Sequence, residues 1–155
     1  MTLLPRLGEN TQQLASDIGL LVLRLAIGVV FIAHGWGDAA QDGGAAANVE
    51  NYREAGIPLP ELSAWFGAYL QLVGGILVLL GALTRLVCAG FAVIMAGALI
   101  FVHAGEPLVL TPDGSGSGFA FIMLAASLAL LGTGAGRFST DRALITRRTR
   151  SSSGA

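Results

Sequence analysis

The stretch RLAIGVVFIAHGWGD, residues 24–38, decides the fold, because it is apolar almost throughout and yet carries Arg24 at its start and His34 ten residues later. An amphipathic surface helix would show a polar face at every turn, and this stretch does not. Extended upstream to residue 18, the run is about 20 residues long, the length that crosses a hydrocarbon core of about 30 Å. It therefore predicts a transmembrane helix over residues 18–37.

Three further apolar runs of similar length cover residues 60–83, 85–104 and 117–135. Hydrophobic residues make up 54% of the 155-residue chain and charged residues 12%, and the mean hydropathy is +0.70. A soluble domain of this size has too few polar groups to cover so much apolar surface. We predict an all-α polytopic membrane protein, a four-transmembrane-helix bundle over residues 18–137. It is flanked by a tail over residues 1–17 and a basic, Ser/Gly-rich tail over residues 138–155.

The distribution of arginine predicts the orientation of these helices. All nine basic residues are arginines. An even number of crossings places seven of them on one side of the membrane and only Arg53 on the other. Because short cytoplasmic segments carry the excess of positive charge, we predict that both termini are cytoplasmic. The seven are Arg6, Arg85, Arg137, Arg142, Arg147, Arg148 and Arg150.

Arg24 is the charged residue placed deepest in an apolar run. An arginine at mid-helix costs about 2.5–3.5 kcal/mol on insertion scales, so it is a functional candidate. Gln71, in the second run, is expected at nearly the same depth, and we predict a hydrogen bond between them. Two alternatives remain open: the arginine stem reaches the cytoplasmic interface, or Asp17, seven residues earlier on the same helix face, receives the guanidinium.

His34 and His103 are both expected near the outer boundary of the membrane. In the simplest interpretation they are interfacial histidines with ordinary partners. Because the imidazole pKa lies near neutrality, they would also suit proton exchange with a quinone headgroup. A third, weaker alternative combines them with two nearby carboxylates into a metal-binding outer cluster, composed of His34, Asp38, His103 and Glu106.

Other sequence features argue against catalysis by this chain alone. Cys88 is the only cysteine, so it has no intramolecular disulfide partner. The sequence contains no nucleophile–base constellation, phosphate-binding loop or nucleotide fingerprint. We therefore predict no catalytic residue, no resident metal and no nucleic-acid partner. The glycine pairs Gly28/Gly35 and Gly90/Gly97, with Gly74–Gly75, are interpreted as close helix-packing faces.

Four segments in order resemble the DoxX-like family of small membrane proteins. They are RLAIGVVFIAHG (24–35), GIPLP (56–60), QLVGGILVLLGALTR (71–85) and GRFSTDRAL (136–144), and the resemblance covers about residues 18–144. It implies a four-helix domain in a bacterial cytoplasmic membrane, associated with quinone-linked or oxidative-stress redox complexes. Arg85, Arg137, Asp141 and Arg142 are assigned structural or topological roles.

The chain departs from the family pattern at two positions. The family commonly has glutamate where Gln71 stands and often has lysine where Asp38 stands. Both departures change the charge at candidate positions.

The resulting functional hypothesis is a membrane subunit or anchor of a redox complex that contacts quinone through Arg24, Gln71, His34 and His103. One alternative is a non-catalytic scaffold or assembly factor whose polar residues lock helices together. The other is a small-solute transporter, which would require a homo-oligomer because four helices enclose only a narrow path. The lipid bilayer is a partner in each case.

Overall fold

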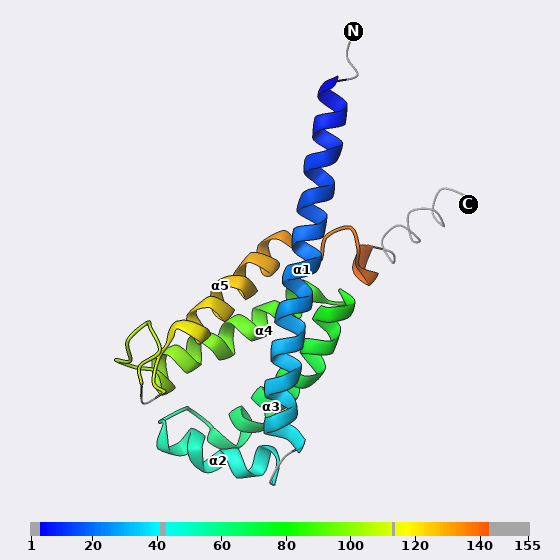
Figure 1. The fold of residues 1–155 in the computed structure, drawn as a ribbon. Coiled ribbons are helices and arrows are strands. Elements are labelled where there is room, and N and C mark those ends of the chain that lie inside the picture. The colour runs from blue at the N-terminus through cyan, green and yellow to red at the C-terminus, as the bar shows by residue number, and fades with distance from the viewer. Residues whose placement is uncertain (1–3, 41–42, 113, 143–155) are drawn as a thin grey trace, which may run out of the picture.

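The computed structural model describes residues 4–40, 43–112 and 114–142, and all regular structure in these ranges is helical. The prediction of an all-α chain is confirmed for them. The predicted C-terminal tail lies outside the described residues from position 143 onward, and with it Arg147, Arg148 and Arg150. The elements are α1 (Leu4–Ala40), α2 (Ala45–Glu54), α3 (Pro60–Leu80), α4 (Thr84–Gly97), a π-helical turn (Ala98–Val102) that continues α4, and α5 (Gly118–Thr133) (Figure 1).

Helix α1 is longer than the predicted first span. It begins at Leu4, so most of the segment expected as a tail is helical. Pro5 fits the first turn of a helix, and no other proline occurs before Ala40 to end it. At 1.5 Å per residue its 37 residues extend for about 55 Å, well beyond a hydrocarbon core. The N-terminal part of α1 accordingly projects past the other helices (Figure 1).

Glycines bring α1 and α3 into backbone contact. A Cβ atom on Gly28 would lie 3.0 Å from the Gly75 carbonyl oxygen, and one on Gly35 would overlap the backbone of Leu72. Gly74 faces the other way, where a Cβ would lie 2.8 Å from Val87 of α4. Such small residues let helices approach closely in a membrane. The predicted packing role is confirmed for these glycines.

The two glycines of the remaining pair, Gly90 and Gly97, differ in their surroundings. A Cβ on Gly90 would lie 2.8 Å from the Leu70 side chain, so this glycine does form a helix contact. The prediction is wrong for Gly97, where an added Cβ would meet no atom of another helix within 4 Å. Gly97 is the last residue of α4 before the π-helical turn.

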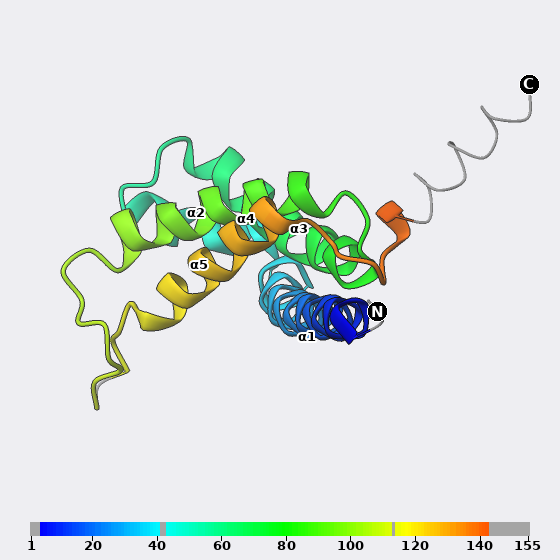
Figure 2. The same cartoon turned by 90° about the horizontal axis from the view of Figure 1, so that it is seen from above.

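The helices form two pairs, α1 with α3 and α4 with α5, while α2 lies across α3 (Figures 1 and 2). The rings of Phe31 on α1 and Phe91 on α4 stack with centroids 3.6 Å apart and join the two pairs at the centre. Around them lies one core cluster of buried apolar side chains: Ile27, Val78, Val87, Cys88, Met123 and Leu130.

Large apolar side chains also cover the outer surface of the helices. Val22, Leu86, Val93 and Ile122 are 60–71% exposed, which suits contact with lipid rather than water. Three helices are long and apolar enough to cross a membrane, over Asn10–Ala40, Pro60–Leu80 and Thr84–Val102. The described chain is thus a helical membrane protein.

Helix α5 is apolar but shorter than the predicted fourth span over residues 117–135. It has 16 residues and ends where Gly134 adopts a φ of +79°, a conformation that favours glycine and terminates helices. Together with the start of α4 and the end of α3, its C-terminal end forms what we call the arginine-rich end of the bundle. The segment after it, residues 134–142, is called the strap.

Candidate functional site

Arg24 is buried at the arginine-rich end with its guanidinium among backbone carbonyls. Its Nε donates to the Val78 oxygen at 3.2 Å, and one terminal nitrogen donates to Ala135 and Phe138 at 2.5 and 2.8 Å. The other terminal nitrogen donates to Leu79 at 3.4 Å. Four of the five guanidinium N–H groups are thereby used. Two of these carbonyls belong to the end of α3 and two to the strap, so Arg24 links these segments. The positive charge also suits the partial negative charge of carbonyls at a helix C-terminus.

The predicted hydrogen bond between Arg24 and Gln71 is therefore wrong, and the reason is helix register. Because α1 and α3 are antiparallel and meet at Gly28 and Gly75, Arg24 lies four residues before one contact and Leu79 four residues after the other. Gln71 is displaced toward the opposite end of the bundle. Asp17 does not receive the guanidinium either, because its Oδ1 accepts the backbone N–H of Arg137 at 3.0 Å.

Asp141 fastens the strap to the start of α4. Its two carboxylate oxygens accept the backbone N–H groups of Leu83 and Thr84 at 2.8 and 3.1 Å, while its own N–H donates to the Gly81 oxygen at 3.0 Å. An N-terminal cap normally comes from the residue next to the helix, whereas this one comes from 57 residues away for Thr84. Asp141 thus holds the loop between α3 and α4.

Further contacts hold this end of the bundle together. Arg85 at the start of α4 donates to the Gly132 oxygen near the end of α5 at 3.1 Å. The backbone N–H of Arg142 donates to the Ser139 hydroxyl at 3.3 Å. Thr84 is fully buried, and its hydroxyl has no hydrogen-bond partner within the described residues. This end of the bundle is held together largely by side chain to backbone contacts.

Gln71 belongs to a polar cluster at the opposite end, between α1, α2 and α3. Its side-chain amide donates to Asp38 at 3.3 Å, and the amide of Asn48 donates to the other Asp38 oxygen at 3.0 Å. Gln71 is 8% exposed and Asp38 is half-buried, so the contact is partly shielded from water. Gln71 and Asp38, where the family resemblance leads us to expect glutamate and lysine, are therefore in contact with each other.

Sequence reasoning missed the contribution of α2 to this cluster. Asn48 and Tyr52 lie one turn apart on α2, a spacing that puts both on one face. The Tyr52 hydroxyl packs over Gly67 of α3, where an added Cβ would lie 2.9 Å from it. Burial, followed by the nearby charge of Asp38, raises the pKa of Tyr52 above its ordinary value. The only sequence signal for this contribution was the helical spacing of polar residues within residues 45–55.

The two histidines have separate partners. His34 is exposed on α1, and its ring lies 5.3 Å from that of Phe119 at the start of α5. His103 pairs through Nδ1 with Glu106 at 2.7 Å, and the same Glu106 oxygen accepts the Gly116 N–H at 2.9 Å. His103 and Glu106 thus organise the loop before α5.

The outer cluster considered for a metal does not assemble in this structure. Asp38 is engaged by Asn48 and Gln71, while Glu106 is engaged by His103. Over the described ranges, no group of three or more His, Cys, Asp or Glu side chains is close enough to hold a metal ion. The short spacing between each histidine and the carboxylate that follows it did not determine whether the two histidine–carboxylate pairs would come together in the fold.

Long apolar helices, joined by backbone contact at glycines and by polar links at both ends, define a helical membrane protein. Residues 19–104 match the sequence model of the DoxX family. The chain is 30% identical over 125 residues to "Putative oxidoreductase CatD" of Bacillus subtilis (strain 168), covering 81% of this chain and 86% of that protein. It is 32% identical over 133 residues to "Inner membrane protein YqjF" of Escherichia coli (strain K12), covering 83% and 93%. No solved structure matches the chain significantly. The chain belongs to the DoxX family.

Proposed function

We propose that this protein is a non-catalytic membrane subunit that anchors a redox assembly in the bacterial inner membrane. The observation that carries the proposal is the hydrogen bonding of Arg24, whose guanidinium donates to four backbone carbonyls. The candidate most able to polarise a substrate therefore serves the architecture. Similarity to a relative named as an oxidoreductase supplies the redox class, and similarity to one named as an inner membrane protein supplies the location.

The proposal includes a quinone contact at His34. Its ring is exposed and faces Phe119, which is 53% exposed, at the end of the bundle opposite the arginines. An aromatic face and an imidazole side by side suit a quinone ring and its carbonyl. His103 is engaged with Glu106, so we assign it a structural role.

The proposal also includes four crossings with both termini in the cytoplasm. The 16 residues of α5 extend for about 24 Å, close to the thickness of a hydrocarbon core, and the polar strap continues from its end. The excess of arginine at the strap end supports a cytoplasmic location for that end.

Single-cysteine labelling tests this topology. Cys88 is buried, and Cys88→Ala provides a background without accessible thiols. In intact cells a membrane-impermeant maleimide is expected to label Glu54→Cys, on exposed α2, and to leave Gln12→Cys unlabelled until the membrane is opened. Labelling of Gln12→Cys in intact cells would show that the N-terminus lies outside the cytoplasm and would contradict the proposed orientation.

Purification in mild detergent tests the redox assignment. The intact chain is expected to retain a partner that carries a flavin, haem or iron–sulfur chromophore, identified by absorbance and mass spectrometry. Bound quinone is measured by solvent extraction, and His34→Leu is expected to lose it while His103→Gln keeps it. Recovery of a homo-oligomer with neither redox partner nor quinone would refute the proposal.

A further inference from the structure

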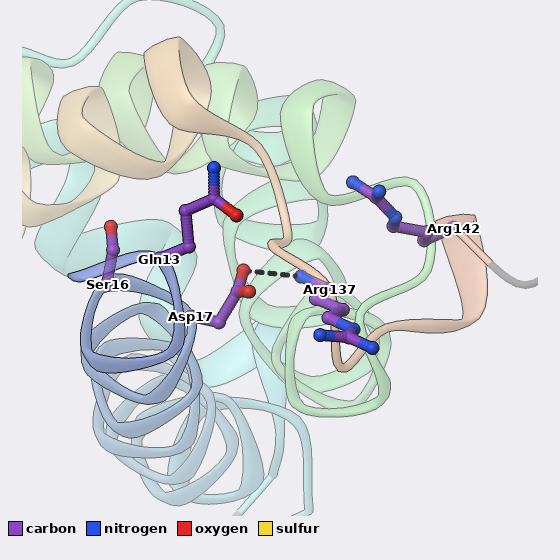
Figure 3. A pocket seen from close by; sticks show the side chains of 5 residues that line it. All are labelled: Gln13, Ser16, Asp17, Arg137 and Arg142. Carbon is purple, nitrogen blue, oxygen red and sulfur yellow. Dashed lines mark hydrogen bonds between the residues drawn. The ribbon is translucent and has the colours of Figure 1, made fainter. Parts of the chain in front are cut away.

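A cavity of about 440 Å³ opens at the arginine-rich end between α1 and the strap. This volume lies within the range of small-molecule sites, about 300–1,000 Å³. The described residues that line it are Gln13, Ser16 and Asp17 from α1 together with Arg137 and Arg142 from the strap (Figure 3). No role in the proposed redox assembly uses this cavity.

The walls of the cavity are fixed by contacts already present in the fold. Gln13, Ser16 and Asp17 share one face of α1, since they are three and four residues apart. The Asp17 carboxylate holds the Arg137 backbone N–H at 3.0 Å, the contact drawn in Figure 3. Gly136, with a φ of +73°, passes close to α1, where an added Cβ would lie 3.3 Å from the Leu20 side chain. The cavity is therefore formed before any ligand arrives.

The charge of the cavity favours an anion. The lining contains two arginines and one aspartate, and one oxygen of that carboxylate is engaged by a backbone amide. Guanidinium groups bind phosphate in a paired, planar geometry, which makes arginine the residue most suited to this anion. Gln13 and Ser16 add neutral hydrogen-bond donors on the opposite wall.

An apolar stripe begins at the level of the cavity. Leu14 adjoins Asp17 on α1, and Ile18 and Val22 continue from it onto the outward side of the helix; the three are 46%, 48% and 60% exposed. Phe138, beside Arg137 on the strap, is 45% exposed. Ile18 starts the apolar run that defines the first span, so the cavity lies where headgroups meet hydrocarbon. A ligand that uses both surfaces is an amphiphile with an anionic head.

We propose that this cavity binds the phosphodiester headgroup of an anionic phospholipid. The headgroup phosphate lies between Arg137 and Arg142, and the acyl chains pass Phe138 and Leu14 into the surrounding hydrocarbon. Basic pockets beside transmembrane helices on the cytoplasmic side are a recurrent way to recognise such lipids. The bound lipid would connect α1 to the strap from outside.

Lipid titration of the purified full chain tests the proposal. Native mass spectrometry in detergent measures the affinities for phosphatidylglycerol and phosphatidylcholine. We expect wild type to prefer phosphatidylglycerol and the double variant Arg137→Gln/Arg142→Gln to bind it about tenfold or more weakly. Arg53→Gln, on exposed α2, is the matched control and is expected to keep the wild-type preference. Glutamine at position 137 retains the backbone N–H that Asp17 accepts.

A second variant guards against a misfolded strap. Gln13→Glu adds a carboxylate to the α1 wall without touching the strap, and it is also expected to weaken phosphatidylglycerol binding. Unchanged preference for phosphatidylglycerol in this variant or in a folded double variant would overturn the proposal. Inorganic phosphate at millimolar concentration is added as a competitor. Full displacement of phosphatidylglycerol by it would show that the site takes free phosphate instead of lipid.

Discussion

The polar side chains considered as functional candidates make two kinds of hydrogen bond. Some bond to backbone atoms, and others bond to another polar side chain. Arg24 belongs to the first kind, since every hydrogen bond that its side chain makes in the described structure ends on a carbonyl. Gln71 and Asp38 belong to the second. Substitution of Arg24 therefore leaves backbone carbonyls without a donor. Substitution of Gln71 or Asp38 leaves the other side chain of the pair without its partner.

Replacement of Arg24 by methionine is expected to destabilise the fold by about 2–4 kcal/mol, because buried carbonyls lose a charged donor and water does not replace it. Arg24→Lys should recover only part of the loss, since an ammonium group offers three donors without the planar fork. Thermal unfolding in detergent, followed by circular dichroism, measures the difference. Arg53→Met on the exposed α2 surface is the control, and equal melting of the two methionine variants would contradict the assignment.

The Gln71–Asp38 contact can be tested by changing the charge of each partner in turn. Gln71→Glu is expected to place a second carboxylate about 3.3 Å from Asp38 and to destabilise the fold. Asp38→Asn in the same chain should restore a donor–acceptor pair and rescue it. A double-mutant cycle measures a coupling of about 1–3 kcal/mol. Additive effects of the two substitutions would show that the side chains do not interact.

Thr84 offers a test of a different kind. Its buried hydroxyl has no hydrogen-bond partner within the described residues, whereas its backbone N–H is held by Asp141. Thr84→Val removes the hydroxyl, keeps the shape and is expected to stabilise the protein by about 1 kcal/mol. Thr84→Ser keeps the hydroxyl and leaves a small void, so it should not stabilise. A lower melting temperature for the valine variant would mean that the hydroxyl contributes to stability.

The strap is an element without regular structure along most of its length, yet it contacts α1, the end of α3 and the start of α4. Asp141→Ala removes two acceptors at the start of α4 and is expected to cost about 1–2 kcal/mol, the range of a lost helix cap. Hydrogen exchange should show faster opening of the Leu83 and Thr84 amides. Asp141→Asn keeps one acceptor oxygen and should lose less, and protection equal to wild type in the alanine variant would exclude a capping role.

For the molecule as a whole, the sequence was enough for the class of fold and for identifying most of the glycines at which helices pack closely. Apolar length and composition depend on the residues themselves, so α1, α3 and α4 were found, with errors mainly at their ends. The partner of Arg24 could not be found in this way. Ala135 is 111 residues away, and whether it meets Arg24 depends on the register of two helices and the path of the strap. The α2 cluster was missed for the same reason.

That register rests on a few glycines in α1, so it can be tested by adding single methyl groups. Gly35→Ala is expected to force α1 away from the Leu72 backbone and to destabilise the protein by about 1–3 kcal/mol. Gly37→Ala, two residues along the same helix, has open space around its Cβ and should be neutral or stabilising by up to about 1 kcal/mol. Both variants raise helix propensity alike, so a difference in unfolding temperature isolates the contact with α3. Because displacement of α1 also moves Arg24 from its carbonyls and Asp38 from Gln71, Gly35→Ala should weaken both ends of the bundle in hydrogen exchange. Loss of protection at one end alone would show that α1 does not move as a rigid body.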